Sequence, residues 1–369
     1  MFKSRFWKNF DWLLAGVTLL LAIIGILILF SSSRSAGGSV STADVRNQLI
    51  FLVLALGAMV GLAWVDYRVW AQMTGRLYVV MLGSLALVEV LGKTALGATR
   101  WINLGFFQFQ PSELAKLILI IIFAKVFSEH YDQLDSPKYL LLSLGYLALP
   151  LLLVLAQPDL GTGIVLVIIW LAMALVSRMP KRYPLGLIVL GVILLPIGTT
   201  FLKPYQRQRL DTFFQPTANP LGSGYNVVQS TIAVGSGQLL GRGLAAGSQS
   251  QLNFLPSQQT DFIFAVLAEK LGFVGGVLLI TLFGVLLFRI LAIGYGSQDR
   301  FGLFLAVGVV AMLLVHLVVN VGMNLGIMPV TGIPLPLVSY GGTNLIISLA
   351  AIGLVESVVV RRKKIEFGT

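Results

Sequence analysis

Residues 12–31 of the chain read WLLAGVTLLLAIIGILILFS, a run without a single charged side chain. In helical conformation, about 20 predominantly apolar residues span the hydrocarbon core of a bilayer. A cleavable signal peptide is the alternative, because Lys3, Arg5 and Lys8 precede the run. The run lacks a clear small-residue cleavage site and further apolar runs follow it, so we predict an uncleaved first membrane span.

Apolar runs of this kind recur along the whole chain. Hydrophobic residues make up 57% of the 369 residues and charged residues only 11%, whereas about a quarter of an average soluble domain is charged. We therefore predict an all-α polytopic membrane protein, a single integral membrane domain over residues 1–369. Ten transmembrane helices are expected, at residues 12–31, 48–65, 77–91, 111–128, 139–156, 161–176, 183–202, 261–288, 301–325 and 343–360. In the eighth, the crossing itself is expected to start near Leu271, after a helical extension.

The distribution of Lys and Arg predicts the orientation. If the chain starts inside, the cytoplasmic segments hold more basic residues than the outer ones, as the positive-inside rule requires. Both termini are thus predicted to be cytoplasmic. The net charge of +11 then reflects topology, and nucleic-acid binding is not expected because the basic residues are dispersed. The chain has no cysteine, which excludes disulfide and thiolate chemistry.

One extracytoplasmic loop is much longer than the others. Residues 203–260, between the seventh and eighth spans, are rich in Gly, Gln, Ser and Asn. Long loops within a compact fold are usually functional when they lack the composition of a linker. The active face is therefore expected outside, where several polar groups fall at the outer ends of spans.

Two Gln-Pro-acid motifs lie at such outer ends. Pro111 and Glu113 suit the first and third positions of a helix, so capping alone accounts for them. Capping does not account for Lys116, three residues further on the same face and inside an apolar span. The second motif ends at Asp159, where Pro-Asp-x-Gly is also ordinary turn chemistry. Because the motif repeats on one side of the membrane, a functional role is considered beside the structural one.

A polar seam is predicted in the ninth span. His316, Asn320 and Asn324 follow at intervals of four residues and drift by only about 80° around a helix, so they share one face that should point into the bundle. Hydrogen bonding between helices is the favoured explanation, because His and Asn commonly link membrane helices. Catalysis is the alternative.

A carboxylate stands at the head of the eighth span, in LPSQQTDFIF (residues 255–264). An ionisable group beside hydrocarbon is costly, so Asp261 is expected to have a partner or a task. On a continuous helix, Glu269 would lie about 80° from Asp261 and Lys270 on the opposite side, so Asp261 and Glu269 are expected to line one cavity. Capping of the helix by Asp261 is the structural alternative, and it would lower the pKa of the carboxyl and make it a poor base.

Other motifs are missing from the sequence. The Gly-rich segment 235–247 lacks the GxGxxG spacing, and there is no GxxxxGK[ST] loop, no HExxH and no Asp-x-Asp pair. A soluble nucleotide-activated donor is therefore disfavoured. What remains is an outer cavity open towards lipid with carboxylates and the cations Arg100, Lys116, Arg207 and Arg209. Cations beside acids suit a hydroxyl nucleophile and a phosphate leaving group, here on a lipid-linked donor.

Several long motifs resemble the SEDS family of bacterial cell-wall synthesis proteins over essentially the whole chain. They are GATRWIN (97–103), QPSE (110–113), QPDLG (157–161), PYQ (204–206), TDFIF (260–264), GIPLP (332–336) and SYGG (339–342). GSQSQL (247–252) and PVTG (329–332) resemble the members that act in cell elongation more than those that act in division.

The resemblance implies a ten-span peptidoglycan glycosyltransferase of the bacterial cytoplasmic (inner) membrane that polymerises lipid II. It implies as partners a class B penicillin-binding protein transpeptidase, membrane proteins of the elongation complex, and the polyprenyl-pyrophosphate-linked glycan. Asp261 matches the family's essential aspartate, and Glu113, Lys116 and Asp159 match polar cavity positions. Ser339 and Tyr340 belong to its SYGG loop.

The chain departs from the family pattern at three positions. Ser257 and Gln259 stand where relatives usually have Glu and His, and Lys270 stands where they usually have Glu. If that His positions a proton in relatives, this chain works without it. Lys270 beside Glu269 also changes the charge of that region.

The predicted mechanism has Asp261 as general base on the 4-hydroxyl of the GlcNAc of an acceptor lipid II. The oxygen attacks the anomeric carbon of the donor with inversion, while Arg100, Arg209 and Lys116 stabilise the departing diphosphate. No metal ligands are predicted in the protein, although a divalent cation, Mg or Mn, is compatible with the reaction. The rival hypotheses are a flippase of lipid-linked cell-wall precursors and a scaffold for the penicillin-binding protein.

Overall fold

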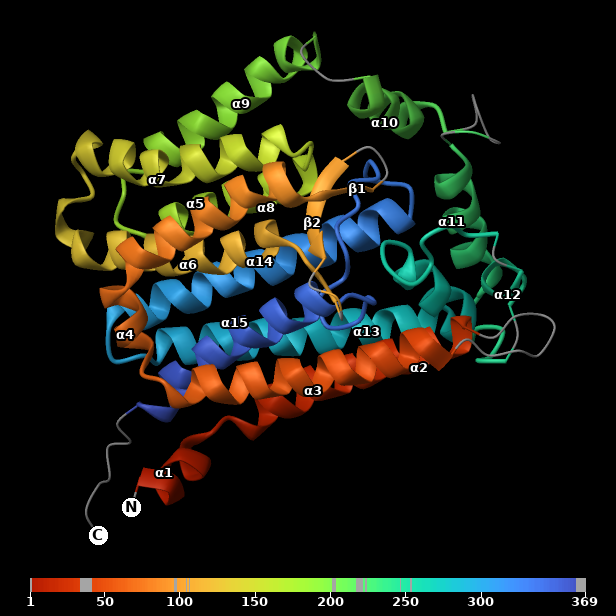
Figure 1. Ribbon diagram of the computed structural model, residues 1–369, viewed down its shortest axis with the longest axis horizontal. Helices are drawn as coiled ribbons and strands as arrows, with labels where there is room; N and C mark the ends of the chain where they lie inside the picture. The colour runs from red at the N-terminus through yellow and green to blue at the C-terminus, as the bar shows by residue number, and fades with distance from the viewer. Residues whose placement is uncertain are drawn as a thin grey trace.

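The computed structural model describes residues 2–33, 42–95, 98–103, 105, 107–200, 204–216, 222, 224–245, 247–252 and 254–362. Long helices run side by side, and the described chain begins and ends at the same end of the bundle (Figure 1). The segment between α9 and α13 covers the opposite end. Of the predicted segments 183–202 and 203–260, residues 201–203, 217–221, 223, 246 and 253 lie outside the described residues.

A helix coincides with each of the ten predicted spans. These helices are α2 (Trp12–Ser32), α3 (Thr42–Trp64), α5 (Thr74–Leu91), α6 (Pro111–Glu129), α7 (Pro137–Ala156), α8 (Leu160–Val176), α9 (Arg182–Thr200), α13 (Ile263–Tyr295), α14 (Arg300–Asn324) and α15 (Gly342–Val360). Local signals set several of the helix starts. Pro111 and Pro137 occupy the first turns of α6 and α7, and Asp11, Asp159 and Asp299 accept backbone N–H bonds at the starts of α2, α8 and α14.

Shorter elements join the long helices. They are α1 (Phe2–Asn9), α4 (Tyr67–Gln72), η1 (Tyr131–Gln133), α10 (Pro204–Phe214), α11 (Tyr225–Ser236), α12 (Ser248–Gln251), and the strands β1 (Lys93–Ala95), β2 (Ala98–Asn103) and β3 (Gln108–Phe109). The strands form a small antiparallel sheet in the order β1-β2-β3. The all-α prediction missed this sheet because its strands are too short to show a period of two. The predicted long loop is also partly helical.

Six of the helices are long and apolar enough to cross a membrane by length and composition: α2, α3 from Ala43, α7, α13, α14 and α15. Two shorter apolar helices, Leu160–Val176 and Arg182–Leu194, add to these. Charge lowers the apolar character of α6, which carries Glu113, Lys116, Lys125 and Glu129. The described chain is therefore a helical, multi-pass membrane protein.

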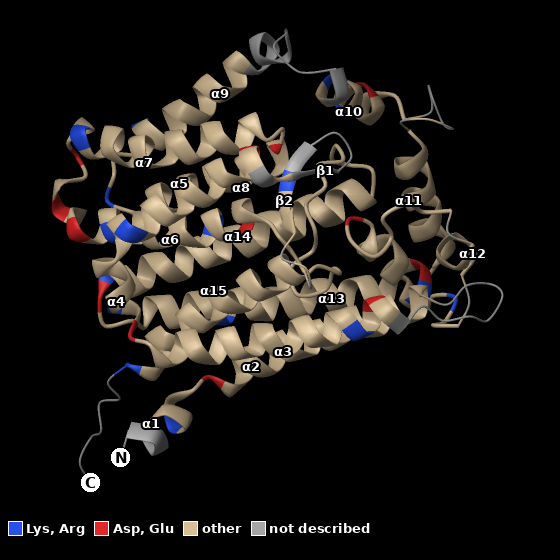
Figure 2. Cartoon of the chain, in the orientation of Figure 1, with Lys and Arg blue, Asp and Glu red and all other residues tan. Residues whose placement is uncertain are grey.

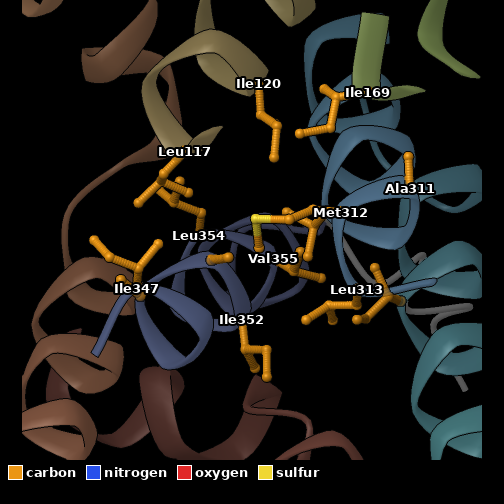
Figure 3. Close-up of a cluster of buried hydrophobic side chains, with 14 of the residues drawn as sticks. Leu117, Ile120, Ile169, Ala311, Met312, Leu313, Ile347, Ile352, Leu354 and Val355 are labelled. Atoms are coloured by element: carbon orange, nitrogen blue, oxygen red, sulfur yellow. The ribbon is translucent and has the colours of Figure 1, made fainter. Parts of the chain in front are cut away.

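Helices α14 and α15 form the centre of the bundle. Of the candidate spans they are the most buried, at 78% and 83% of an 18-residue window, and α14 packs against α6, α8, α13 and α15. Figure 3 shows apolar side chains of α6, α8, α14 and α15 meeting between them, including Ile120, Ile169, Met312 and Val355. Gly353 lets α15 approach the backbone of α3, because a Cβ there would clash with the carbonyl of Met59.

Helix α13 is broken at Gly272, which has φ 68°. Residues 238–243 bind the free backbone groups at the break. The N–H groups of Phe273 and Val274 donate to the carbonyls of Gln238 (2.8 Å) and Leu239 (3.1 Å). The carbonyls of residues 269 and 270 accept from residues 242 and 243, both at 3.0 Å. The break lies close to Leu271, where the crossing was expected to start after a helical extension. The backbone groups that the break frees are hydrogen-bonded within the protein.

Charged side chains concentrate at the two ends of the bundle, and most helices lack them in the middle (Figure 2). At the end with the termini, many form ion pairs, such as Arg68 with Asp299 (2.9 Å) and Arg289 with Asp11 (2.7 Å). At the opposite end, several line a cavity.

Candidate active site

A cavity of about 360 Å³ lies at the end of the bundle opposite the termini. It is enclosed by β2, the first turns of α6 and α8, α10, the turn before α13, α14 and the loop that leads into α15. Its lining residues are Arg100, Trp101, Gln110, Glu113, Asp159, Thr162, Val165, Arg209, Ser257, Thr260, Asp261, His316, Gly332, Ile333, Pro334, Tyr340, Gly341, Thr343 and Asn344.

Asp261 lies in the turn before α13 with its side chain on the cavity. The N-cap residue of α13 is Phe262, and no side chain caps that end among the described residues. Capping therefore does not explain Asp261. Its backbone carbonyl accepts hydrogen bonds from the amide nitrogens of Asn320 and Asn324, both at 3.0 Å.

The environment of Asp261 makes its carboxyl unusually basic. Enclosure by protein raises its pKa to about 6, because desolvation disfavours the charged form. Arg209, a hydrogen bond from Thr260, and Arg100 act in the opposite direction and lower the pKa. The carboxyl thus combines a raised pKa with two cations in reach of its field.

The two arginines reach the cavity from different elements, β2 and α10. Arg209 of α10 donates from Nη1 to the carbonyl of Thr331 (3.2 Å). Arg100 of β2 donates to the carbonyls of Gln157 (Nε, 3.2 Å) and Pro158, and lies 3.7 Å from Oδ1 of Asp159. Backbone carbonyls therefore hold both guanidinium groups at the cavity.

Asp159 is a structural carboxylate that also faces the cavity. Its Oδ1 accepts the backbone N–H of Thr162 (3.2 Å) and its Oδ2 the hydroxyl of the same residue (2.9 Å), which caps α8. Gln110 and Ser112 donate to Oδ2 at 3.3 and 3.5 Å. Hydrogen bonds within the protein therefore use most of its acceptor capacity.

A buried polar chain borders the cavity and includes three of its lining residues, Glu113, His316 and Asn344. Lys116 Nζ donates to Oε1 of Glu113 (2.6 Å) and lies 2.9 Å from Nε2 of His316, whose Nδ1 lies 3.1 Å from the carbonyl of Pro334. Asn344 donates to Oε2 of Glu113 (3.2 Å). With Nδ1 donating to a carbonyl, neutral His316 accepts from the Lys116 ammonium. The pairing with Glu113 thus explains why a lysine lies inside this apolar span, which helix capping does not explain.

The predicted seam on α14 is confirmed as an interhelical hydrogen-bonding face. Asn320 donates to the carbonyls of Asp261 (3.0 Å) and Ile333 (2.8 Å), and Asn324 Oδ1 accepts the N–H of Ala265 (3.0 Å). Ser339 acts in the same way, because its hydroxyl donates to the carbonyl of Thr260 (2.6 Å). These side chains hold the turn that carries Asp261.

Four of the candidate site residues do not line the cavity. Lys116 is buried and paired with Glu113, Ser339 bonds to the carbonyl of Thr260, and Arg207 is exposed on α10. The expectation that Glu269 shares a cavity with Asp261 is wrong. The carboxylate of Glu269 accepts backbone N–H bonds from Gln249 (2.9 Å) and Ser250 (3.1 Å) at α12. The helical extrapolation failed because α13 begins only at Ile263.

The remaining candidates, Arg100, Glu113, Asp159, Arg209, Asp261 and Tyr340, meet at the cavity. Sequence reasoning missed Thr162, Thr343 and Asn344; the polar Thr343 and Asn344 at the start of the last span were the available signal. Of the departures from the family pattern, Ser257 lines the cavity, Gln259 accepts the N–H of Tyr340 with its carbonyl (2.9 Å), and Lys270 is buried elsewhere.

Chemically, the cavity offers one basic carboxylate, two fixed cations and polar walls beside membrane-embedded helices. No group of three or more His, Cys, Asp or Glu suited to a metal occurs in the described part of the chain. Fold and site together define a polytopic membrane protein with a charged cavity at one end of its bundle.

Comparison with known proteins identifies the family. The family model described as "Cell cycle protein" and named for FtsW, RodA and SpoVE matches residues 11–364. The peptidoglycan glycosyltransferase MrdB of Escherichia coli K12 is 39% identical over 364 residues, which cover 98% of this chain and 97% of MrdB. The chain belongs to the FtsW/RodA/SpoVE family, as the SEDS resemblance implied, and is a multi-pass protein of the bacterial cytoplasmic membrane.

Solved structures are similar along the same length. A chain of a peptidoglycan synthase complex that coordinates polymerization and crosslinking gives a TM-score of 0.81 at 33% identity, covering 96% of this chain and 98% of that one. The crystal structure of the rod shape determining protein RodA of Thermus thermophilus gives a TM-score of 0.71 at 30% identity, with the same coverage.

Proposed function

We propose that the chain is a peptidoglycan glycosyltransferase that polymerises lipid II at the outer face of the cytoplasmic membrane during cell elongation, with Asp261 as general base. Membership of the family and the activity named for MrdB support the reaction class. The observation that carries the residue assignment is that Asp261 caps no helix, is desolvated, and lines a cavity together with Arg100 and Arg209.

In the proposed step, Asp261 takes the proton of the GlcNAc 4-hydroxyl of an acceptor lipid II. The oxygen bonds to the anomeric carbon of the donor glycan on the face opposite the diphosphate. The bond from that carbon to the lipid diphosphate breaks, and the configuration of the carbon is inverted. A base with a pKa near the working pH is most effective. The pKa of Asp261, raised to about 6 by burial, suits a base that is mostly deprotonated at neutral pH.

Arg100 and Arg209 bind the departing diphosphate in this proposal. Both guanidinium groups are oriented by backbone carbonyls before substrate arrives, and such preorganised cations stabilise charge that develops in the transition state. Lys116 is committed to Glu113 and His316. It therefore orders the cavity floor, with Glu113 and Tyr340 as contacts for the sugar. A divalent cation would arrive with the substrate's own phosphates.

We extend the proposal to topology. All ten helices that match predicted spans cross the membrane, with both termini in the cytoplasm and the cavity outside. Helix α9 supports access for a lipid-linked substrate: it packs on α8, and Val189, Val192 and Ile193 are 57%, 64% and 63% exposed. The next helix along the chain is α10, which carries Arg209 to the cavity (Figure 1).

The partner in this proposal is a class B penicillin-binding protein that crosslinks the new strands, together with other membrane proteins of the elongation complex. Support comes from the similar chain in a peptidoglycan synthase complex that coordinates polymerization and crosslinking. A transpeptidase beside the cavity would receive glycan as it emerges.

The test is polymerisation of lipid II by the purified chain in detergent, with and without the transpeptidase and with a chelator. Polymer that runs as a ladder on a gel supports the enzyme. A flippase or a scaffold forms no polymer under these conditions, so its absence in every arm would refute the proposal. Loss of product with chelator alone, restored by Mg or Mn, would assign the cation.

A further inference from the structure

The side chain of Asn320 joins two walls of the cavity. Its Nδ2 donates to the carbonyl of Asp261 at 3.0 Å and to the carbonyl of Ile333 at 2.8 Å. The residue is fully buried in α14, the most enclosed region of the bundle together with α15. Both of its amide hydrogens are therefore used on backbone groups next to the proposed reaction site.

On the first wall, the amide fixes the turn that carries the carboxylate of Asp261. That turn lies outside the helix, so helical hydrogen bonds do not hold it. Asn324 donates to the same carbonyl at 3.0 Å, and Ser339 donates to the carbonyl of Thr260 at 2.6 Å. Three buried side chains thus bond to the backbone carbonyls of the turn that carries the Asp261 carboxylate.

On the second wall, the amide fixes residues 331–334. Ile333 and Pro334 line the cavity, and the carbonyl of Thr331 accepts the hydrogen bond from Arg209. His316, one turn before Asn320 on α14, lies 3.1 Å from the carbonyl of Pro334 through Nδ1. The position of Arg209 at the cavity therefore depends on the segment that Asn320 binds.

We infer that Asn320 is a positioning residue that holds Asp261 and the Arg209-binding segment in one fixed arrangement. The inference rests on the proposed role of Asp261 as base. The role goes beyond hydrogen bonding between helices. Asn320 bonds to the backbone carbonyl of the proposed base, Asp261, and to that of Ile333, two residues after the Thr331 carbonyl that binds Arg209.

The magnitudes separate the two roles. Hydrogen bonds between membrane helices contribute little to stability on average. If Asn320 were purely structural, its replacement would lower stability slightly, and activity would fall only as far as the folded fraction falls. A displacement of about 1 Å at a reacting group can lower a rate by about 10²-fold. A positioning role therefore predicts a large loss of kcat in a protein that is still folded.

The pH profile provides an independent readout. Besides Arg209 and Arg100, the titratable groups facing the cavity with Asp261 are Glu113, Asp159, His316 and Tyr340. None of them changes in an Asn320 variant. A carboxylate released from its fixed, enclosed position relaxes towards water and the arginines, which lowers its pKa and moves the acid limb of the profile to lower pH.

The experiment compares purified Asn320→Ala with wild type and with Asn9→Leu. Asn9 also donates an amide N–H to a carbonyl of another helix, that of Val360 at 3.3 Å, but at the other end of the bundle. For Asn320→Ala we expect kcat for lipid II to fall about 10²-fold with KM nearly unchanged. We also expect the acid limb of its profile at lower pH. Asn9→Leu should keep the wild-type rate and profile.

Unchanged kcat in Asn320→Ala would overturn the inference, as would a loss that tracks the unfolded fraction with the acid limb in place. If Asn320→Ala does not fold, Asn320→Ser, too short to bridge both carbonyls, takes the same test. Asp261→Asn is assayed in parallel. Full activity of Asp261→Asn would remove the proposed base itself, whereas an inactive Asp261→Asn beside a fully active Asn320 variant would refute the positioning role alone.

Discussion

Two carboxylates stand at helix starts on the same end of the bundle, and their environments differ in almost every respect. Asp159 is the N-cap of α8, is 4% exposed, and accepts hydrogen bonds from Thr162, Gln110 and Ser112. Asp261 lies one residue before the N-cap of α13 and faces the cavity without capping the helix. A shift of one position relative to the N-cap separates a carboxylate that caps its helix from one that does not.

The difference bears on the proposed role of Asp261 as a base. A carboxylate that accepts several N–H and O–H bonds is stabilised in its charged form and gives up basicity. Asp261 is enclosed by protein, so its pKa rises to about 6. Its turn is held through backbone carbonyls by Asn320 and Asn324, so these two amides do not occupy the carboxylate oxygens.

The largest effect is expected from Asp261→Asn. The amide keeps the size of the side chain but cannot take a proton, so polymerisation should fall by about 10²–10⁴-fold, the usual contribution of a general base. The thermal unfolding temperature should stay within a degree or two of wild type, because Asp261 caps no helix. A lipid II polymerisation assay on the purified variant measures the rate. A rate within a factor of two of wild type would show that Asp261 is not the base.

The next effect concerns Arg209. Arg209→Gln removes a cation proposed to bind the diphosphate, and kcat should fall by about 10²–10³-fold. Arg209 also lowers the pKa of Asp261. Without it, the pKa rises above about 6, so the acid limb of the pH profile should move to higher pH.

The control for this variant is Arg207→Gln on the same helix. Arg207 is exposed and outside the cavity lining, so its rate and profile should match wild type. Equal losses in both variants would mean that general charge on α10, not the place of one guanidinium, serves the reaction.

Much of this arrangement could be predicted from the sequence, because it depends on local signals. Apolar runs located the ten helices, and Pro111 marked the start of α6. The four-residue spacing of His316, Asn320 and Asn324 placed them on one buried face. Each of these inferences uses residues within a few turns of one another.

The rest depends on contacts between distant segments. Glu269 was placed beside Asp261 by continuing one helix. In the structure its carboxylate instead accepts the backbone N–H groups of Gln249 and Ser250, which lie in the segment before α13. Arg207 and Arg209 were not distinguished, because residues 204–214 were expected as loop and so had no assigned faces. The donors to Asp261 could not be found either, since 59 residues separate it from Asn320.

Asp159→Ala tests the structural side of the comparison. Loss of the cap of α8 should lower the free energy of unfolding by about 1–2 kcal/mol, measured by thermal or denaturant unfolding in detergent. Activity should fall far less than in Asp261→Asn, through Arg100, which loses its partner at 3.7 Å. Asp299→Ala is the matched control, since Asp299 caps α14 through Gly302 at the other end of the bundle. Activity as low as that of Asp261→Asn in a folded Asp159→Ala would make Asp159 part of the chemistry.

The smallest effect is expected from Glu269→Gln, which extends the comparison to a third carboxylate. Glu269 accepts two backbone N–H bonds at α12, and Gln retains one oxygen but loses the charge, so stability should fall by about 1 kcal/mol. The acid limb should not move, because Glu269 does not line the cavity with Asp261. A profile shifted towards lower pH, with unfolding unchanged, would instead place a second negative charge within the field of Asp261. In that case the raised pKa of the base would not come from enclosure alone.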